Sequence, residues 1–144
     1  MNNHTDVALI LFNSDVIDLM SFVLLGSNLK SCGFEPSEGA DKIEEFICSH
    51  RPGVVIFDLD PPYQRSTVVL KRLLNRFPDL PFVITCADRM LAITAAPWLC
   101  CHHVFQKPYE PDQIRDVVGS MLSRARNHLG KKTARAADFC PAKW

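Results

Sequence analysis

Short apolar runs alternate along the chain with longer stretches in which apolar positions recur every three or four residues. Such runs are typical of strands buried on both faces, and the longer stretches are typical of helices that pack one face on a sheet. Strands are therefore expected at residues 7–12, 34–36, 54–57, 81–85 and 103–106. Helices are expected at residues 16–30, 40–48, 68–77, 87–96 and 111–126. Each expected strand is thus followed by a helix.

Glycine and proline mark several of the expected boundaries. Cys32-Gly33 is expected to end the first helix, and Pro36 indicates that the second strand lies at a sheet edge. Pro97 ends the fourth helix because proline lacks the amide donor that a helix interior needs, and Pro111 begins the last helix. The connections are short, so successive strands are expected to be parallel and joined by right-handed crossovers. The sequence therefore predicts an α/β fold, a three-layer sandwich.

The length and apolar content indicate one domain with a tail. A chain of 144 residues, 47% of them apolar, can bury a core without disulfides or bound metal. Residues 1–128 are expected to form this domain. Residues 129–144 lose the apolar periodicity and carry an excess of lysine and arginine, which predicts a basic, mobile C-terminal tail.

Charge and hydropathy exclude several classes of function. Sixteen basic and sixteen acidic residues give a formal net charge of zero, so the chain has no overall electrostatic attraction to nucleic acid. No apolar stretch reaches the roughly 18–20 residues that span a membrane, and the first residues do not resemble a secretion signal. The six cysteines are therefore expected to be reduced thiols. These features predict a soluble, cytoplasmic protein.

Polar side chains lie at the ends of three of the expected strands. Asp58 follows the third strand, Thr85 ends the fourth and Lys107 follows the fifth. The carboxyl ends of parallel strands meet at one edge of the sheet, so these side chains are expected to converge on a shallow pocket. A carboxylate can act as a nucleophile, while a hydroxyl and an ammonium group donate to phosphate oxygens and offset their charge. The set predicts a site for a phosphoryl group.

Structural interpretations of the candidate residues stay open. Asp58 also suits a cap at the end of a strand, and Lys107 can form an ion pair with it that needs no phosphate. The segment 100–103, Cys-Cys-His-His, has metal-binding side chains, but adjacent residues seldom reach one ion, so buried thiols and exposed imidazoles are the simpler expectation. The turn at residues 12–15 lacks glycine, which argues against a nucleotide- or flavin-phosphate loop.

Two prolines accompany the site residues: Pro62 follows Asp58 in the next loop, and Pro108 follows Lys107. With these motifs, residues 7–126 resemble the receiver domain of two-component response regulators, of the single-domain chemotaxis type. Asp58 matches the phosphoacceptor of that family, Thr85 its hydroxyl residue, and Lys107-Pro108 its lysine–proline pair, in which the peptide is usually cis. The resemblance implies a flavodoxin-like receiver fold with a five-stranded parallel sheet of order 2-1-3-4-5. It implies a signalling module rather than an enzyme, with a histidine kinase or a phosphotransfer protein as partner.

The sequence departs from this family at the acidic pocket and at the switch. Receivers carry two acids after the first strand that bind Mg²⁺, and the corresponding residues here are Asn13 and Ser14. Mg²⁺ prefers carboxylate ligands, so its binding is expected to be weakened, with partial compensation by Asp60. The aromatic switch residue of the family, three positions before the lysine, is replaced by Val104. Phe105 is expected on the opposite face of that strand.

The sequence leaves two functions open. In the first, a phosphorelay receiver, Asp58 accepts a phosphoryl group and Thr85 and Lys107 contact it, which changes the surface of the fourth helix, fifth strand and fifth helix. In the second, a pseudo-receiver binds a partner protein without phosphorylation, and Asn13 and Ser14 favour this alternative. A small-molecule enzyme would need a general base that the sequence does not indicate. Neither a membrane nor a nucleic acid is expected as partner, and homodimerisation, common in the family, has no specific support.

Overall fold

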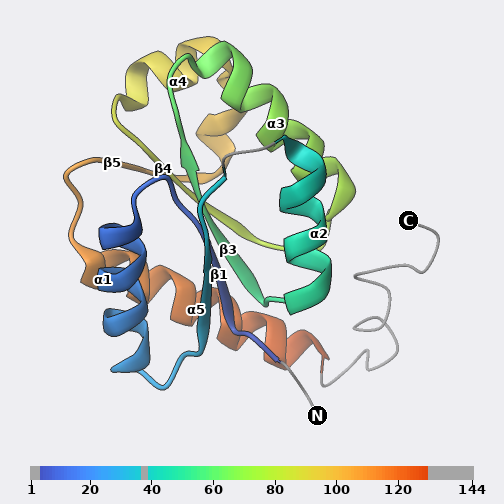
Figure 1. Cartoon of the computed structure of the whole chain (residues 1–144), viewed down its shortest axis with the longest axis vertical. Coiled ribbons are helices and arrows are strands. Elements are labelled where there is room, and N and C mark those ends of the chain that lie inside the picture. Colours follow the sequence, from blue (N-terminus) through green and yellow to red (C-terminus); the bar gives the residue numbers. More distant parts are fainter. Residues whose placement is uncertain (1–3, 37–38, 130–144) are drawn as a thin grey trace.

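The computed structural model describes residues 4–36 and 39–129 and contains a five-stranded parallel sheet (Figure 1). The strands are β1 (Val7–Ile10), β2 (Ser31–Phe34), β3 (Val54–Leu59), β4 (Phe82–Cys86) and β5 (His103–Gln106). Their order in the sheet is β2-β1-β3-β4-β5, which places β3 in the middle. The predicted three-layer α/β sandwich and its strand order are therefore confirmed.

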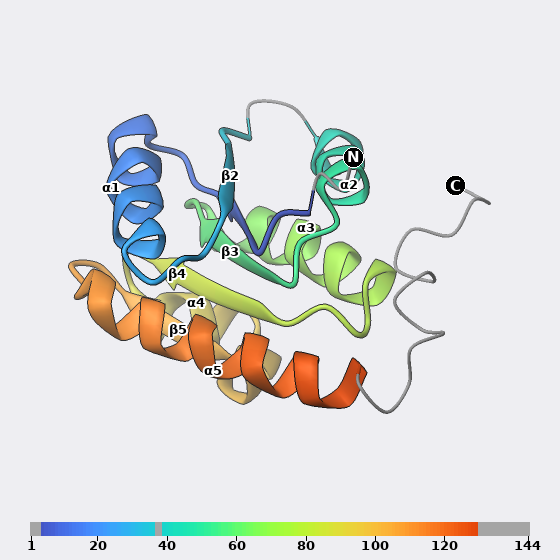
Figure 2. The same ribbon diagram turned by 90° about the horizontal axis from the view of Figure 1, so that it is seen from below.

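Helices cover both faces of the sheet. They are α1 (Ser14–Leu25), α2 (Ala40–His50), α3 (Tyr63–Arg76), α4 (Arg89–Ala95) and α5 (Pro111–Leu129), together with a 3₁₀ helix, η1 (Pro97–Cys101). Figure 2 shows α1 and α5 on one side of the sheet and α2 and α3 on the other. Within the described residues, no helix has the length and apolar character that crossing a membrane requires.

The strand β3 is buried over its whole length because both of its faces meet helices. Val54 and Ile56 belong to the core under α1 and α5, which we call the α1–α5 core. Val55 and Phe57 belong to the core under α2, α3 and α4, which we call the α2–α4 core. Side chains alternate between the two faces along a strand, so Asp58 at the carboxyl end of β3 shares the face of Val54 and Ile56.

The region around β2 differs from the sequence-based prediction. The first helix ends at Leu25 instead of residue 30, and the second strand covers Ser31–Phe34 instead of 34–36. Gly26 caps the helix through its backbone N–H, and Asn28 adopts a positive φ of 59°, so the chain turns before Lys30. The carboxylate of Asp6 then accepts a 2.8 Å hydrogen bond from the backbone N–H of Lys30, which joins this turn to the start of β1.

Gly33 lies inside β2 and does not end a helix. The helix α1 packs closely on this strand, and a Cβ atom at position 33 would collide with the Cγ2 of Ile17. The close approach of α1 to β2 is therefore the reason for glycine at this position. The prediction that Gly33 ends a helix is wrong. The start of α3 also differs by five residues, at Tyr63 instead of residue 68, whereas α4 begins at Arg89, two residues after its expected start.

We expect Gly33→Ala to lower the free energy of unfolding by about 1–3 kcal/mol, because the new methyl group must displace the Ile17 side chain between α1 and β2. Chemical denaturation measures this change. Gly119→Ala is the matched control: nothing lies within 4 Å of its Cβ position, so alanine should stabilise α5 by up to about 1 kcal/mol. Equal stability of Gly33→Ala and the wild type would show that α1 does not pack on β2 as described.

The structure continues α5 to Leu129. The predicted basic tail, residues 129–144, falls outside the described residues from position 130 onward.

Candidate functional site

Asp58 lies at the centre of the carboxyl edge of the sheet. It is only 4% exposed, because β3 runs between β1 and β4 and helices cover both faces. In the sheet register, Asp58 pairs with Thr85, and Thr85 pairs with Phe105 on β5. Lys107 directly follows β5, and it is two positions after Phe105, so the two residues share one face of the strand. The strand order and register thus bring the acid, the hydroxyl and the ammonium group to one place.

Both carboxylate oxygens of Asp58 have partners. The Thr85 hydroxyl donates a 3.0 Å hydrogen bond to Oδ1, and the Lys107 ammonium donates a 2.9 Å hydrogen bond to Oδ2. The Lys107 side chain is 40% exposed and that of Asp58 is 6% exposed, so the lysine reaches the carboxylate from the solvent side. The ion pair compensates a charge that would otherwise be costly to bury. The three residues predicted to converge therefore do so, with Thr85 and Lys107 each in direct contact with Asp58.

The backbone around Lys107 is fixed to the neighbouring strand. Its N–H donates a 2.8 Å hydrogen bond to the carbonyl of Cys86, the last residue of β4. The Lys107–Pro108 peptide is cis, as the resemblance implied, and Pro61–Pro62 is cis as well. The hydrogen bond therefore fixes the backbone of Lys107 beside the end of β4.

The neutral residues after β1 lie at the beginning of α1. Asn13 is the N-cap: its Oδ1 accepts a 2.8 Å hydrogen bond from the backbone N–H of Asp15. Ser14 is the first residue of the helix, and both Asn13 and Ser14 are exposed. Asn13 thus has a structural role that an aspartate would also fill, because both residue types are good N-caps.

A cavity of about 280 Å³ lies beside Asp58 and is also lined by Asp60, Arg65 and Ser66. Two carboxylates therefore border the same space, and Mg²⁺ is commonly held by one or two carboxylates with water completing its shell. The two carboxylates present fit such an ion, although an acid pair after β1 would add two more. In the part of the chain that the structure describes, no three His, Cys, Asp or Glu side chains are grouped as metal ligands.

Arg65 is a residue that sequence reasoning missed. It lies in the first turn of α3, is exposed, and lines the cavity beside Asp58 and Asp60. The Ser66 hydroxyl oxygen lies next to it in the lining, shielded from solvent and without a hydrogen-bond partner among the described residues. The only signal in the sequence was a basic residue between Asp58 and the helix expected at residues 68–77.

Tyr63 is a second residue that was missed, and it holds the loop after Thr85. Its buried phenol oxygen accepts a 2.9 Å hydrogen bond from the backbone N–H of Asp88. Asp88 in turn caps α4, because its Oδ1 accepts a hydrogen bond from the N–H of Leu91. The Gln106 side chain accepts from the N–H of Arg89 and links the same loop to β5. Thr85 is thus connected to the start of α4 through a short loop held on two sides.

Val104 and Phe105 lie on opposite faces of β5, as the alternation of side chains along a strand predicted. Val104 is half-buried and packs on the α2–α4 core. Phe105 packs on the α1–α5 core, on the other face of β5. Phe105 therefore does not replace the aromatic side chain that the family carries at the position of Val104.

Two further ionisable groups near Asp58 stay neutral at neutral pH. Burial raises the pKa of the Cys86 thiol, and the carboxylates of Asp58 and Asp88 raise it further. Burial also raises the pKa of the Tyr109 phenol, with a smaller contribution from Asp58. Neither group is thus a source of an anionic nucleophile at neutral pH.

The Cys-Cys-His-His segment lies at the end of η1, away from Asp58. Cys100 and Cys101 are exposed, so the expectation that these thiols are buried is wrong. Leu99 is the buried residue of η1, and Cys100 and Cys101 follow it on the solvent side. His103 is exposed, as expected, whereas His102 is half-buried and meets Trp98 edge-on at 5.9 Å between ring centroids.

The overall structure is similar to solved structures, although neither protein-family models nor curated proteins give a match to the sequence. The receiver domain of nitrogen regulatory protein C shares 21% identity and a TM-score of 0.67, over 88% of this chain and 99% of that one. A response regulator receiver domain protein (CheY-like) from Methanospirillum hungatei shares 11% identity and a TM-score of 0.70, over 87% and 98%. A structure described as a transiently phosphorylated switch in bacterial signal transduction shares 22% identity and a TM-score of 0.68, over 85% and 98%.

The chain has the fold of response regulator receiver domains. At these identities the likeness concerns the course of the backbone. The receiver fold explains why Asp58, Thr85 and Lys107 meet, since its strand order places the ends of β3, β4 and β5 side by side. What these side chains do follows from their chemistry.

Proposed function

We propose that this protein is a receiver module of a two-component phosphorelay, with Asp58 as the phosphoacceptor. The observation that carries the proposal is the buried carboxylate of Asp58, whose oxygens are held by the Thr85 hydroxyl and the Lys107 ammonium. The receiver fold supports it, because the similar structures are signalling domains. A histidine kinase or a phosphotransfer protein in the cytoplasm is the proposed donor.

The contacts of Asp58 suit the transfer of a phosphoryl group from a phosphohistidine. A carboxylate oxygen of Asp58 forms the new bond to phosphorus, and the bond from phosphorus to the imidazole nitrogen breaks. The electron pair leaves with the imidazole, which takes up a proton. Lys107 and Thr85 then donate to oxygens of the phosphoryl group, so the charge that they now offset on the carboxylate is exchanged for charge on the phosphate.

Asp58 and Asp60 would hold Mg²⁺ at this site. When bound, the ion would offset negative charge on the phosphoryl oxygens. With Asn13 and Ser14 in place of acids, we expect weaker binding than a site with two more carboxylates would give. Arg65 adds a fixed positive charge to the same cavity, which partly compensates for the missing acids by attracting the phosphoryl group itself.

The loop after Thr85 gives a route from the site to the surface. A shift of the Thr85 hydroxyl toward a phosphoryl oxygen would displace residues 86–88, which the Tyr63 phenol and the Gln106 side chain hold. The helix that begins there, α4, exposes Met90 and Leu91, so a shift of its first turn changes an apolar surface that a partner protein can read. Phosphorylation biases the population between two positions of this loop.

We expect the wild type to gain the mass of one phosphoryl group when it is incubated with a small acyl phosphate and Mg²⁺. Asp58→Asn should gain none, because the amide oxygen is not a nucleophile toward phosphorus. Asp18→Asn is the matched control, since it removes an exposed carboxylate of α1 that does not line this cavity, and it should keep the adduct. Intact-mass spectrometry measures all three. An unmodified wild type that also shows no response to beryllofluoride would refute the proposal.

A pseudo-receiver that binds its partner without phosphorylation is the second candidate. One observation favours it: the neutral residues Asn13 and Ser14 stand where receivers carry two acids. The ion pair between Asp58 and Lys107 would then hold the carboxyl edge of the sheet in one state. This candidate predicts equal partner binding by the wild type and by Asp58→Asn, whereas the first predicts binding that follows the phosphoryl group.

A further inference from the structure

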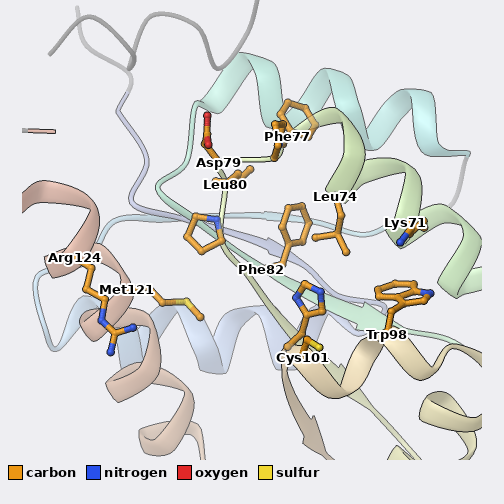
Figure 3. Close-up of a pocket in the computed structure, with 13 residues that line it drawn as sticks. Lys71, Leu74, Phe77, Asp79, Leu80, Phe82, Trp98, Cys101, Met121 and Arg124 are labelled. Atoms are coloured by element: carbon orange, nitrogen blue, oxygen red, sulfur yellow. The ribbon is translucent and has the colours of Figure 1, made fainter. Parts of the chain in front are cut away.

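A second, larger cavity of about 840 Å³ lies at the other end of β4, away from Asp58. It opens between α3, η1 and α5, and its lining shares no residue with the cavity beside Asp58 (Figure 3). Phe82, the first residue of β4, forms its floor together with Leu74, and Trp98 and Met121 add apolar surface from η1 and α5. Ligand sites commonly have this size and this apolar, aromatic lining.

Basic side chains surround the apolar floor. Lys71 from α3 and Arg124 from α5 are exposed at the rim (Figure 3). His102 also lines the cavity. The Lys71 ammonium lies 4.9 Å from the centroid of the Trp98 ring, over its face. Neither Lys71 nor Arg124 forms an ion pair with another residue in the described chain, while Asp79 is the only acid in the lining. The cavity therefore combines aromatic surface with positive charge that nothing in the lining fully offsets.

We propose that this cavity binds a small organic anion with a flat aromatic body. The aromatic part would lie on Phe82 and beside Trp98 and His102, and the anionic group, a phosphate or a carboxylate, would meet Lys71 or Arg124. Trp98 and His102 already form an edge-on pair at 5.9 Å, a geometry that a third ring can extend. The cationic rim selects an anion over a neutral aromatic compound.

Charge argues against the C-terminal segment of the chain as the occupant. Residues 130–144 carry Lys131, Lys132, Arg135 and Lys143 with the single acid Asp138, so they would bring further positive charge to a positive rim. An anionic ligand gains from the same charges. The site is also independent of the proposed phosphorylation, because Asp58 takes no part in it.

The test uses 1-naphthyl phosphate as the probe, with 1-naphthol and inorganic phosphate as its two halves, in calorimetric titrations of the full chain. We expect the naphthyl phosphate to bind at least about tenfold more tightly than either half, since hydrogen bonds to charged groups add to the apolar contact. Equal affinity for 1-naphthol would show a merely apolar surface. Equal affinity for inorganic phosphate would show a merely cationic one, and either result would overturn the proposal, as would the absence of binding.

Substitutions locate the binding. The double variant Lys71→Gln with Arg124→Gln should weaken naphthyl phosphate binding about tenfold, and Trp98→Leu should weaken it as well. Lys42→Gln is the matched control, because Lys42 is an exposed lysine on another helix, and it should bind like the wild type. The two rim residues are exposed, so their replacement leaves the core intact even if Trp98→Leu fails to fold. Unchanged affinity in the double variant would overturn the assignment, and Asp58→Asn should bind normally.

Discussion

Replacing Asn13 and Ser14 together with aspartate is expected to raise the affinity for Mg²⁺ by about tenfold or more, because Mg²⁺ is a hard cation that prefers carboxylate ligands. Both residues follow β1, which is the neighbour of β3 in the sheet, so the new carboxylates would face the edge where Asp58 lies. The fold should persist, since aspartate caps a helix as well as asparagine does. Calorimetric titration of Mg²⁺ into both proteins measures the change.

The control for this pair places the same two charges at the other end of α1. Ser27→Asp with Asn28→Asp changes two exposed residues of the turn after the helix, and aspartate tolerates the positive φ of position 28. This variant should bind Mg²⁺ like the wild type. If the Asn13 and Ser14 variant also binds Mg²⁺ no better than the wild type, the loop after β1 does not face the metal, and the inferred match to the acid pair of receivers is wrong.

The sequence predicted the strands correctly where the local apolar pattern and the tertiary structure agree. The runs at β3, β4 and β5 are apolar, short and bounded by proline or polar residues, and each became a strand within a residue or two of its expected bounds. The meeting of Asp58, Thr85 and Lys107 followed from the same pattern, because parallel strands joined by helices must end at a common edge.

The sequence failed where the decisive interaction lies far along the chain. Gly33 was interpreted as a helix stop, but its reason is the close contact with Ile17 on a neighbouring element. The turn at Gly26 and Asn28 did carry a local signal, a glycine followed by a residue that adopts positive φ readily, and apolar periodicity obscured it.

The supporting contacts of the site were out of reach for a related reason. The hydrogen bond between the Tyr63 phenol and the N–H of Asp88 joins the start of one helix to the loop before the next. Neither residue belongs to a periodic pattern or to a motif, so only coordinates reveal the pair. The cavity around Trp98 depends in the same way on three elements that are not consecutive in the chain.

We expect Lys107→Met to lower the free energy of unfolding by about 1–3 kcal/mol, because it leaves the carboxylate of Asp58 buried with the Thr85 hydroxyl as its remaining partner. The loss should stay below that of a fully buried pair, since the lysine side chain is 40% exposed and water can enter where it stood. Chemical denaturation measures the change. Lys42→Met, which removes an exposed lysine from α2, is the control and should change stability by less than about 0.5 kcal/mol.

The cause of the loss can be isolated with a double-mutant cycle. Asp58→Asn keeps an oxygen that accepts from Thr85 while removing the charge, so in this background Lys107→Met should cost about 1 kcal/mol less than in the wild type. The ion pair then compensates a buried charge and is not a net source of stability. This suits the proposed role of Asp58 as phosphoacceptor, in which the lysine passes from the carboxylate to a phosphoryl oxygen while the edge of the sheet stays folded. An equal cost of Lys107→Met in both backgrounds would show that the lysine stabilises the protein through its packing, and that its contact with Asp58 contributes nothing.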